Sequence, residues 1–165
     1  MMFKNIFRPR VVRGLGSIIT AFYLALFLST GCRTGPPLPP ANLNEPGWTI
    51  RQGQAVWHTA KGQEFAGDVL VGTKGPDRSV VQFTKTPFTL VMAQVSDNKW
   101  HVEFPPQNRH YSGHGKGPTR VIWFYLPRAL SKGYLPEKFK WHQDEQGWRL
   151  ENTANGEFLE GYFTE

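Results

Sequence analysis

Cysteine is almost absent from this chain. Cys32 is the only one among 165 residues, so no disulfide bond can form within the chain, whatever the redox state of its compartment. An unpaired thiol in an exported protein needs an explanation, and lipid attachment supplies one.

Catalytic motifs are absent too. The sequence contains no Gly-x-Ser-x-Gly, no phosphate-binding loop and no His-Glu-x-x-His, the signatures of α/β-hydrolases, nucleotide-binding enzymes and zinc proteases. No cysteine remains to serve as a nucleophile once Cys32 is assigned to lipid. We therefore predict a protein that is not an enzyme and needs no cofactor, because a hydrolase would lack the residues to perform its reaction.

Two weaker polar patterns also occur in the sequence. His110 and His114 are four residues apart, which would place both on one face of a helix, but the glycines beside His114 disfavour a helix. We predict a mobile surface loop over 109–118 and no metal site. Asp97 and Glu103 are interpreted as solvated carboxylates and not as an acid–base pair.

The positive charge is concentrated at the start of the chain. The formal net charge is +6, but four of the nineteen basic residues precede residue 32, which leaves fifteen basic against thirteen acidic residues and a net charge of +2. A charge this small gives no support for nucleic-acid binding.

The first 31 residues have the three-part pattern of an export signal. A basic start without acids is followed by an uncharged run of fourteen residues, Leu15 to Leu28, and by small residues that lead into Cys32. The segment 28–32 resembles the lipobox of bacterial prolipoproteins, in which the cysteine is acylated. An uncleaved transmembrane anchor is the alternative, but the run is shorter than the roughly 20 residues that span a bilayer.

Three parts follow from this interpretation. Residues 1–31 are a lipoprotein signal peptide, residues 32–46 are an acylated cysteine with a tether, and residues 47–165 form one domain. Five prolines between Arg33 and Pro46 favour an extended tether of about 3.1 Å per residue, long enough to hold the domain up to roughly 40 Å from a membrane.

From Trp48 onward, short segments of alternating apolar and polar residues are separated by turn residues. This pattern is typical of antiparallel strands joined by hairpins. It predicts a mainly β fold with eight or nine strands. Residues 119–133 break the alternation, because every position from Val121 to Leu126 is apolar. We expect a short helical segment there, restarted at Pro127 and ended at Gly133; a buried strand at 121–126 is the alternative.

Aromatic side chains are abundant, with six tryptophans and twelve phenylalanines. They fit either the filled core of a small β domain or a sheet whose apolar face is partly open to a guest molecule.

The order of these parts resembles the LolA/LolB family, the carrier and outer-membrane receptor that move lipoproteins across the periplasm. The resemblance covers about residues 48–163 and rests on the segments 62–67, 78–88, 99–106, 126–136, 147–152 and 156–163. It implies an antiparallel curved sheet forming a half-barrel, whose apolar hollow is closed by a helix-bearing lid.

The resemblance also implies a function. The protein would be a monomer anchored in the outer membrane by lipid on Cys32, facing the periplasm, and Arg33 in place of the Asp that commonly retains lipoproteins in the inner membrane agrees with this location. It would receive an acyl chain or a lipoprotein from a periplasmic carrier. The expected hollow is lined by Val71, Phe83, Leu90, Met92, Trp100, Val102 and Trp141, with Trp123 and Leu126 on the lid.

One further residue is implied by the resemblance. LolB-like receptors carry an exposed leucine after an Asn-Pro between two early strands, where it assists membrane insertion of cargo, and Phe88 follows Thr86-Pro87 in the matching place. The competing hypothesis is a non-enzymatic structural or inhibitor-type envelope lipoprotein, with a filled core and a function located on loops such as 109–118.

Overall fold

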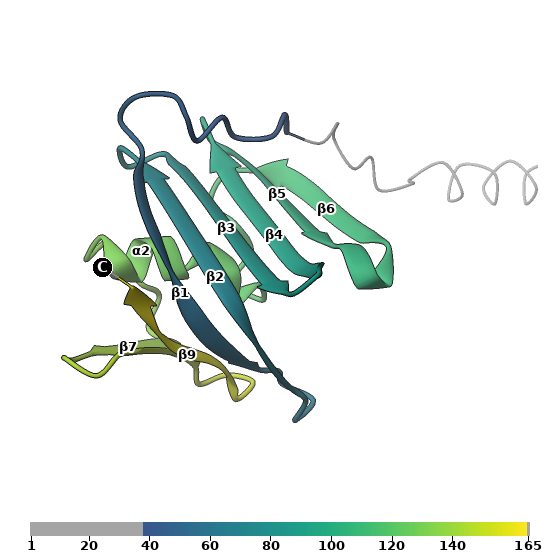
Figure 1. Cartoon of the computed structure of the whole chain (residues 1–165), viewed down its shortest axis with the longest axis vertical. Helices are drawn as coiled ribbons and strands as arrows, with labels where there is room; N and C mark the ends of the chain where they lie inside the picture. The colour runs from purple at the N-terminus through teal and green to yellow at the C-terminus, as the bar shows by residue number, and fades with distance from the viewer. Residues whose placement is uncertain (1–37, 165) are drawn as a thin grey trace, which may run out of the picture. The chain divides into compact units, whose positions relative to one another are not determined.

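The computed structural model describes residues 38–164, which form one antiparallel sheet of nine strands (Figure 1). The predicted signal peptide and its lipid attachment site, Cys32, lie outside the described residues. The strands and short helices are β1 (Thr49–His58), β2 (Glu64–Lys74), β3 (Arg78–Lys85), β4 (Phe88–Ser96), β5 (Lys99–Phe104), η1 (Pro105–Gln107), β6 (Arg109–His114), η2 (Ile122–Phe124), α2 (Leu126–Leu130), β7 (Phe139–Gln143), β8 (Trp148–Asn152) and β9 (Glu157–Thr164).

Consecutive hairpins build most of the sheet. The strand order is β6-β5-β4-β3-β2-β1-β9-β8-β7, so β1 pairs with both β2 and β9. The chain reaches one edge at β6 and then crosses to β7 at the opposite edge. This single long connection carries η2 and α2 past one face of the sheet, which we call the inner face; α2 contacts β2 and β3, and η2 contacts β4, β8 and β9.

The predicted fold class, mainly β with one antiparallel sheet and a short helical segment near 119–133, is confirmed. The sheet is open and uncurled, whereas the resemblance led us to expect a curved half-barrel. Curling is not needed to bury the apolar inner face, because the crossing segment covers it instead.

Local sequence explains how the crossing segment and the turns form. Pro127 lies in the first turn of α2, where its missing N–H costs nothing, and the Gly133 N–H closes the helix on the Arg128 carbonyl at 2.8 Å. Between β4 and β5, Asp97 and Asn98 both have positive φ, 49° and 65°. Positive φ values are typical of a two-residue hairpin turn, and Asp and Asn are among the residue types that tolerate them.

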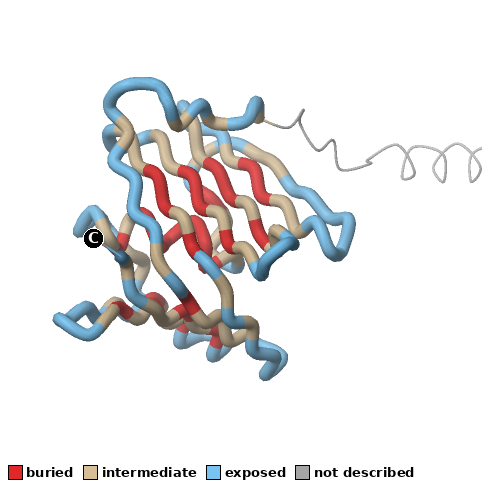
Figure 2. Tube along the Cα trace, viewed as in Figure 1, coloured by how far each residue is buried: buried red, intermediate tan, exposed pale blue. Residues whose placement is uncertain are grey.

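The hydrophobic core lies between the inner face and the crossing segment, and the buried stretches of neighbouring strands are level with one another (Figure 2). Strand residues alternate between this core and the outer face, as the period of two requires. The core residues contributed by strands are Ala55, Val69, Val71, Val81, Phe83, Val91, Ala93, Val102, Phe139, Trp148, Leu150 and Leu159.

Residues 38–46, predicted as part of an extended tether, pack against the outer face. The Gln94 amide donates to the Pro39 carbonyl at 3.0 Å, and Lys74 pairs with Glu45 at 2.8 Å. A side chain at Gly72 would press on Leu43, so this glycine lets the segment lie close to the sheet. Any free tether is therefore shorter than we predicted. Within the described residues, no helix is long and apolar enough to cross a membrane.

Candidate functional site

The structure gathers five of the nine predicted hollow residues around one interior. Three come from strands β2, β3 and β5, and two come from the crossing segment. Their exposed fractions are 2% or less: Val71, Phe83, Val102, Trp123 and Leu126.

This interior is filled. Residues 121–126, which we call the plug, pack their aromatic side chains against the inner face of the sheet. The Trp123 ring stacks on Phe83 with centroids 5.0 Å apart, and it meets the edge of Trp57 at 5.5 Å. Phe124 contacts Trp100 at 5.6 Å. The plug therefore occupies the space that the resemblance reserves for a guest.

The hydrogen bonds of the plug stay within the crossing segment. The Val121 N–H donates to the Pro118 carbonyl, the Tyr125 N–H to Ile122, and the buried Tyr125 hydroxyl to the Gly117 carbonyl at 2.9 Å. None of these bonds reaches a strand, so side-chain packing attaches the plug to the inner face. Packing has no directional partner to preserve, and another apolar group of similar size can replace it.

One polar atom of the plug is left without a partner. The Nε1–H of Trp123 is buried and makes no hydrogen bond, a state shared within the described residues by three other buried side-chain nitrogens. A buried donor of this kind costs about 1–3 kcal/mol. The plugged arrangement is therefore less stable than its apolar contacts alone would make it.

Two predicted hollow residues, Leu90 and Met92, lie on β4 beside an irregularity in its pairing with β3. A register shift between Phe83 and Thr84 interrupts the pairing of β3 with β4, and this irregularity turns Val91 and Ala93 toward the core. Met92, between them, therefore faces outward, so its assignment to the hollow is wrong. Leu90 lies at the shift and still packs against the core. A β-bulge reverses the faces of the residues beyond it, and simple alternation does not show where a bulge occurs.

The last two predicted residues, Trp100 and Trp141, are partly buried against the rim of the core. Trp100 covers Gly113 of β6, where a Cβ would lie 2.6 Å from the indole. Trp141 stacks with Trp148 at 6.1 Å. Both are large apolar side chains that are partly accessible to solvent at the edge of the core.

Glu157 was missed by the sequence reasoning, although it supports the site. Its carboxylate accepts a hydrogen bond from the Trp57 indole at 2.9 Å, and this bond holds the ring of Trp57 against Trp123. Burial raises the pKa of Glu157 above its ordinary value, against the opposing effect of the bond from Trp57. A single acidic residue in a turn-and-strand pattern gives no sign of this burial, because its partner is 100 residues away.

Glu157→Gln should remove a pH-dependent loss of stability. The pKa is raised in the folded state, so the contribution of Glu157 is fully present below the unfolded pKa of about 4.5 and is lost as pH rises through the higher folded pKa. Glutamine keeps an oxygen for Trp57 and does not titrate. Urea unfolding at a series of pH values should show that the free energy of unfolding of the variant rises relative to that of the wild type from pH 4.5 upward. A constant difference across that range would contradict the assignment.

The histidine segment differs from the prediction in structure. Arg109–His114 is strand β6, not a loop, and only the residues after it are irregular. The 3₁₀ turn before it ends at Asn108 with a φ of 49°, which sends the chain back along β5. No group of three or more metal-binding side chains gathers within the described residues.

Neither carboxylate of the rejected acid–base pair is isolated. Asp97 bonds to Arg78 at 3.2 Å, and this bond, with a second one from Ser96, lowers the pKa of Asp97. Glu103 lies 2.7 Å from the ring of His101. Each carboxylate thus has its own structural partner.

Phe88 is the exposed apolar residue that the resemblance singles out. It begins β4 immediately after the β3–β4 turn, and 68% of its surface is accessible. Few large apolar side chains of the described part are so exposed. It is therefore free to contact a membrane or a partner.

The chain matches no protein-family model, and no curated protein matches it. The LolA/LolB resemblance thus stays a prediction from the sequence.

Proposed function

We propose that this protein is a lipoprotein anchored in the outer membrane through Cys32, which takes an acyl chain onto its inner face in exchange for the plug. In LolB-like fashion, it would accept the lipid part of a lipoprotein from a periplasmic carrier and pass it to the membrane. One observation carries the proposal: the plug is attached to the strands by apolar packing, while its hydrogen bonds stay within its own segment.

The free energies make this exchange feasible for long chains. The plug side chains from Ile122 to Leu126 are at most 2% exposed, and burying each contributes roughly 1.5–3 kcal/mol, so removing all five costs roughly 8–15 kcal/mol. A 16-carbon chain, at about 0.8 kcal/mol per methylene, gains about 12 kcal/mol, and an 8-carbon chain gains about 6 kcal/mol. Only the longer chain can balance the loss.

Binding should therefore depend steeply on chain length. The described residues, 38–164, belong to one compact unit that contains the whole core. A polypeptide of residues 34–165 can be titrated with fatty acids of 8, 12 and 16 carbons below their micelle concentrations. The 16-carbon chain should bind and shift tryptophan emission to longer wavelength, as Trp123 leaves the core. Native mass spectrometry would show the bound chain directly.

The controls separate exchange from surface adsorption. Adsorption on the outside would add mass without moving the emission of buried tryptophans. If the 16-carbon chain neither adds mass nor shifts the emission, the exchange proposal is wrong.

Phe88 is the residue that we propose to contact the membrane or the incoming cargo. Phe88→Ser should leave the free energy of unfolding within about 0.5 kcal/mol of the wild type, because the side chain is exposed. It should slow transfer of an acylated peptide from the protein to vesicles. Equal transfer rates in the two proteins would exclude this role, and Tyr162→Ser, which alters another exposed aromatic residue, is the matched control.

A second candidate function is favoured by the filled interior itself. If the plug never leaves, the protein is a tethered module that binds through its surface, as a structural or inhibitor-type envelope lipoprotein. The same titration decides between the two, because this module would leave the 16-carbon chain unbound.

A further inference from the structure

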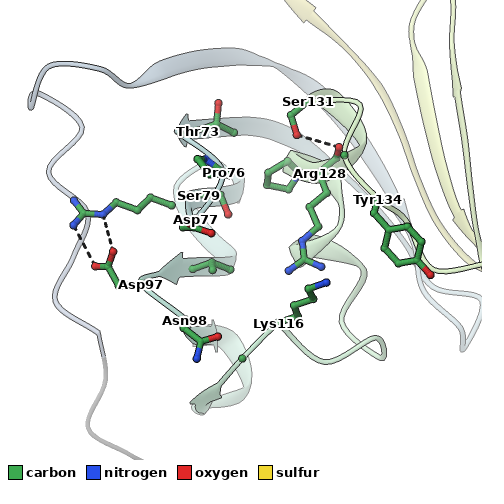
Figure 3. A pocket seen from close by; sticks show the side chains of 16 residues that line it. Thr73, Pro76, Asp77, Ser79, Asp97, Asn98, Lys116, Arg128, Ser131 and Tyr134 are labelled. Atoms are coloured by element: carbon green, nitrogen blue, oxygen red, sulfur yellow. Dashed lines mark hydrogen bonds and ion pairs between the residues drawn. The ribbon is translucent and has the colours of Figure 1, made fainter.

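A cavity of about 670 Å³ lies outside the core, at one end of the sheet. The turns that join β2 to β3 and β4 to β5 form one wall, and the crossing segment forms the other (Figure 3). Pro127, Arg128 and Ser131 reach it from α2 or just beyond, and Lys116 reaches it from the residues after β6. It shares no residue with the plug.

Two positively charged side chains of this cavity, Lys116 and Arg128, form no ion pair within the described residues. Each is held over an aromatic ring instead: the Lys116 ammonium lies 5.8 Å from the Tyr134 centroid, and the Arg128 guanidinium 5.1 Å from that of Tyr125. In Figure 3 the two charged groups point toward one another. Such rings position cations without neutralising them.

The acidic groups of the cavity belong to the opposite wall. Asp97 is already paired with Arg78 at 3.2 Å, so this pair adds no net charge. Asp77, in the β2–β3 turn, is exposed and has no ion pair within the described residues. The wall formed by the crossing segment is therefore positive, and the opposite wall has one free carboxylate.

We propose that this cavity binds a phosphate group between Lys116 and Arg128. A guanidinium offers a planar pair of donors that matches phosphate oxygens, and an ammonium adds a compact charge beside it. The volume lies within the range of small-molecule sites, so the phosphate belongs to a larger molecule: a lipid headgroup or a soluble phosphate ester.

Binding should stabilise the domain, because the two cations lie on either side of the plug in sequence and a shared anion would tie them together. The full chain would be placed in uncharged phosphatidylcholine vesicles, and thermal unfolding followed by tryptophan fluorescence. One arm adds pyrophosphate at constant ionic strength, and the other adds phosphatidic acid to the vesicles. Saturating ligand should raise the unfolding midpoint by about 5 °C or more.

Lys116→Gln and Arg128→Gln should each abolish most of this shift, whereas Lys140→Gln, at an exposed position of β7, should retain it. A shift in either arm supports the site. A shift with phosphatidic acid alone identifies a lipid headgroup as the ligand, and a shift with pyrophosphate alone identifies a soluble phosphate ester. A shift in both arms shows that the site accepts either. The proposal is overturned if neither arm moves the midpoint, if Lys140→Gln removes the shift equally, or if citrate reproduces it in full. The acyl titration is independent, so either proposal can fail without the other.

Discussion

Trp123→Ala should weaken the fold and strengthen acyl binding at the same time. The Trp123 side chain is completely buried against Phe83 and Trp57, and truncating such a residue to alanine costs about 3–5 kcal/mol of stability. In an ordinary core residue this loss would also damage any binding site nearby. In the plug it lowers the free energy that a guest must supply to displace the segment.

The expected gain in affinity is large. Removing about 3 kcal/mol from the cost of displacement would tighten binding of a 16-carbon chain by roughly 100-fold, since each 1.4 kcal/mol is a factor of ten. A milder variant, Tyr125→Phe, removes only the hydroxyl bond to Gly117 and keeps the ring on Phe139. Because this bond lies within the crossing segment and does not attach the plug to a strand, the variant should lose about 1 kcal/mol of stability and bind the 16-carbon chain with nearly unchanged affinity.

Urea unfolding and fatty-acid titration of the same samples would measure both quantities. Leu159→Ala is the matched control, because Leu159 is fully buried on β9, outside the plug. It should lose a similar amount of stability without a gain in affinity. If Trp123→Ala and Leu159→Ala bind the 16-carbon chain equally, the plug is an ordinary part of the core.

Gly161→Ala should be among the most destabilising small substitutions in the domain. Gly161 lies on β9 opposite Ala55 of β1, and a Cβ there would overlap the Gln54 carbonyl oxygen and lie 2.9 Å from the Ala55 Cα. These are backbone atoms of the strand that joins the two halves of the sheet, so they cannot move aside cheaply. We expect a loss of at least about 3 kcal/mol, at the upper end for overpacking.

Gly62→Ala provides the comparison. Gly62 has a positive φ of 76° but nothing within 4 Å of the added methyl group, so its cost should be limited to the conformational term of about 1 kcal/mol. Thermal or urea unfolding measures both variants. Similar losses at the two positions would show that β1 and β9 approach less closely than described.

Residue types alone determined much of this protein. Alternation and turn residues predicted antiparallel strands joined by hairpins, and the structure contains them. The uniformly apolar residues from Val121 to Leu126, followed by Pro127, predicted the helical segment in the right place. These are local signals: each depends on residues a few positions apart, and backbone geometry converts them directly into strands, turns and helical turns.

Only the tertiary structure decided how the inner face is covered. The sequence showed that Trp123 and Phe83 are apolar, but they are 40 positions apart, and no local pattern states whether one fills the space beside the other or leaves it to a guest. The outward turn of Met92 follows from a register shift between two strands, and the burial of Glu157 from a partner on β1. The cavity with Lys116 and Arg128 likewise exists because the crossing segment passes the ends of two hairpins. Each is a consequence of long-range packing, which depends on the whole chain at once and not on any window of it.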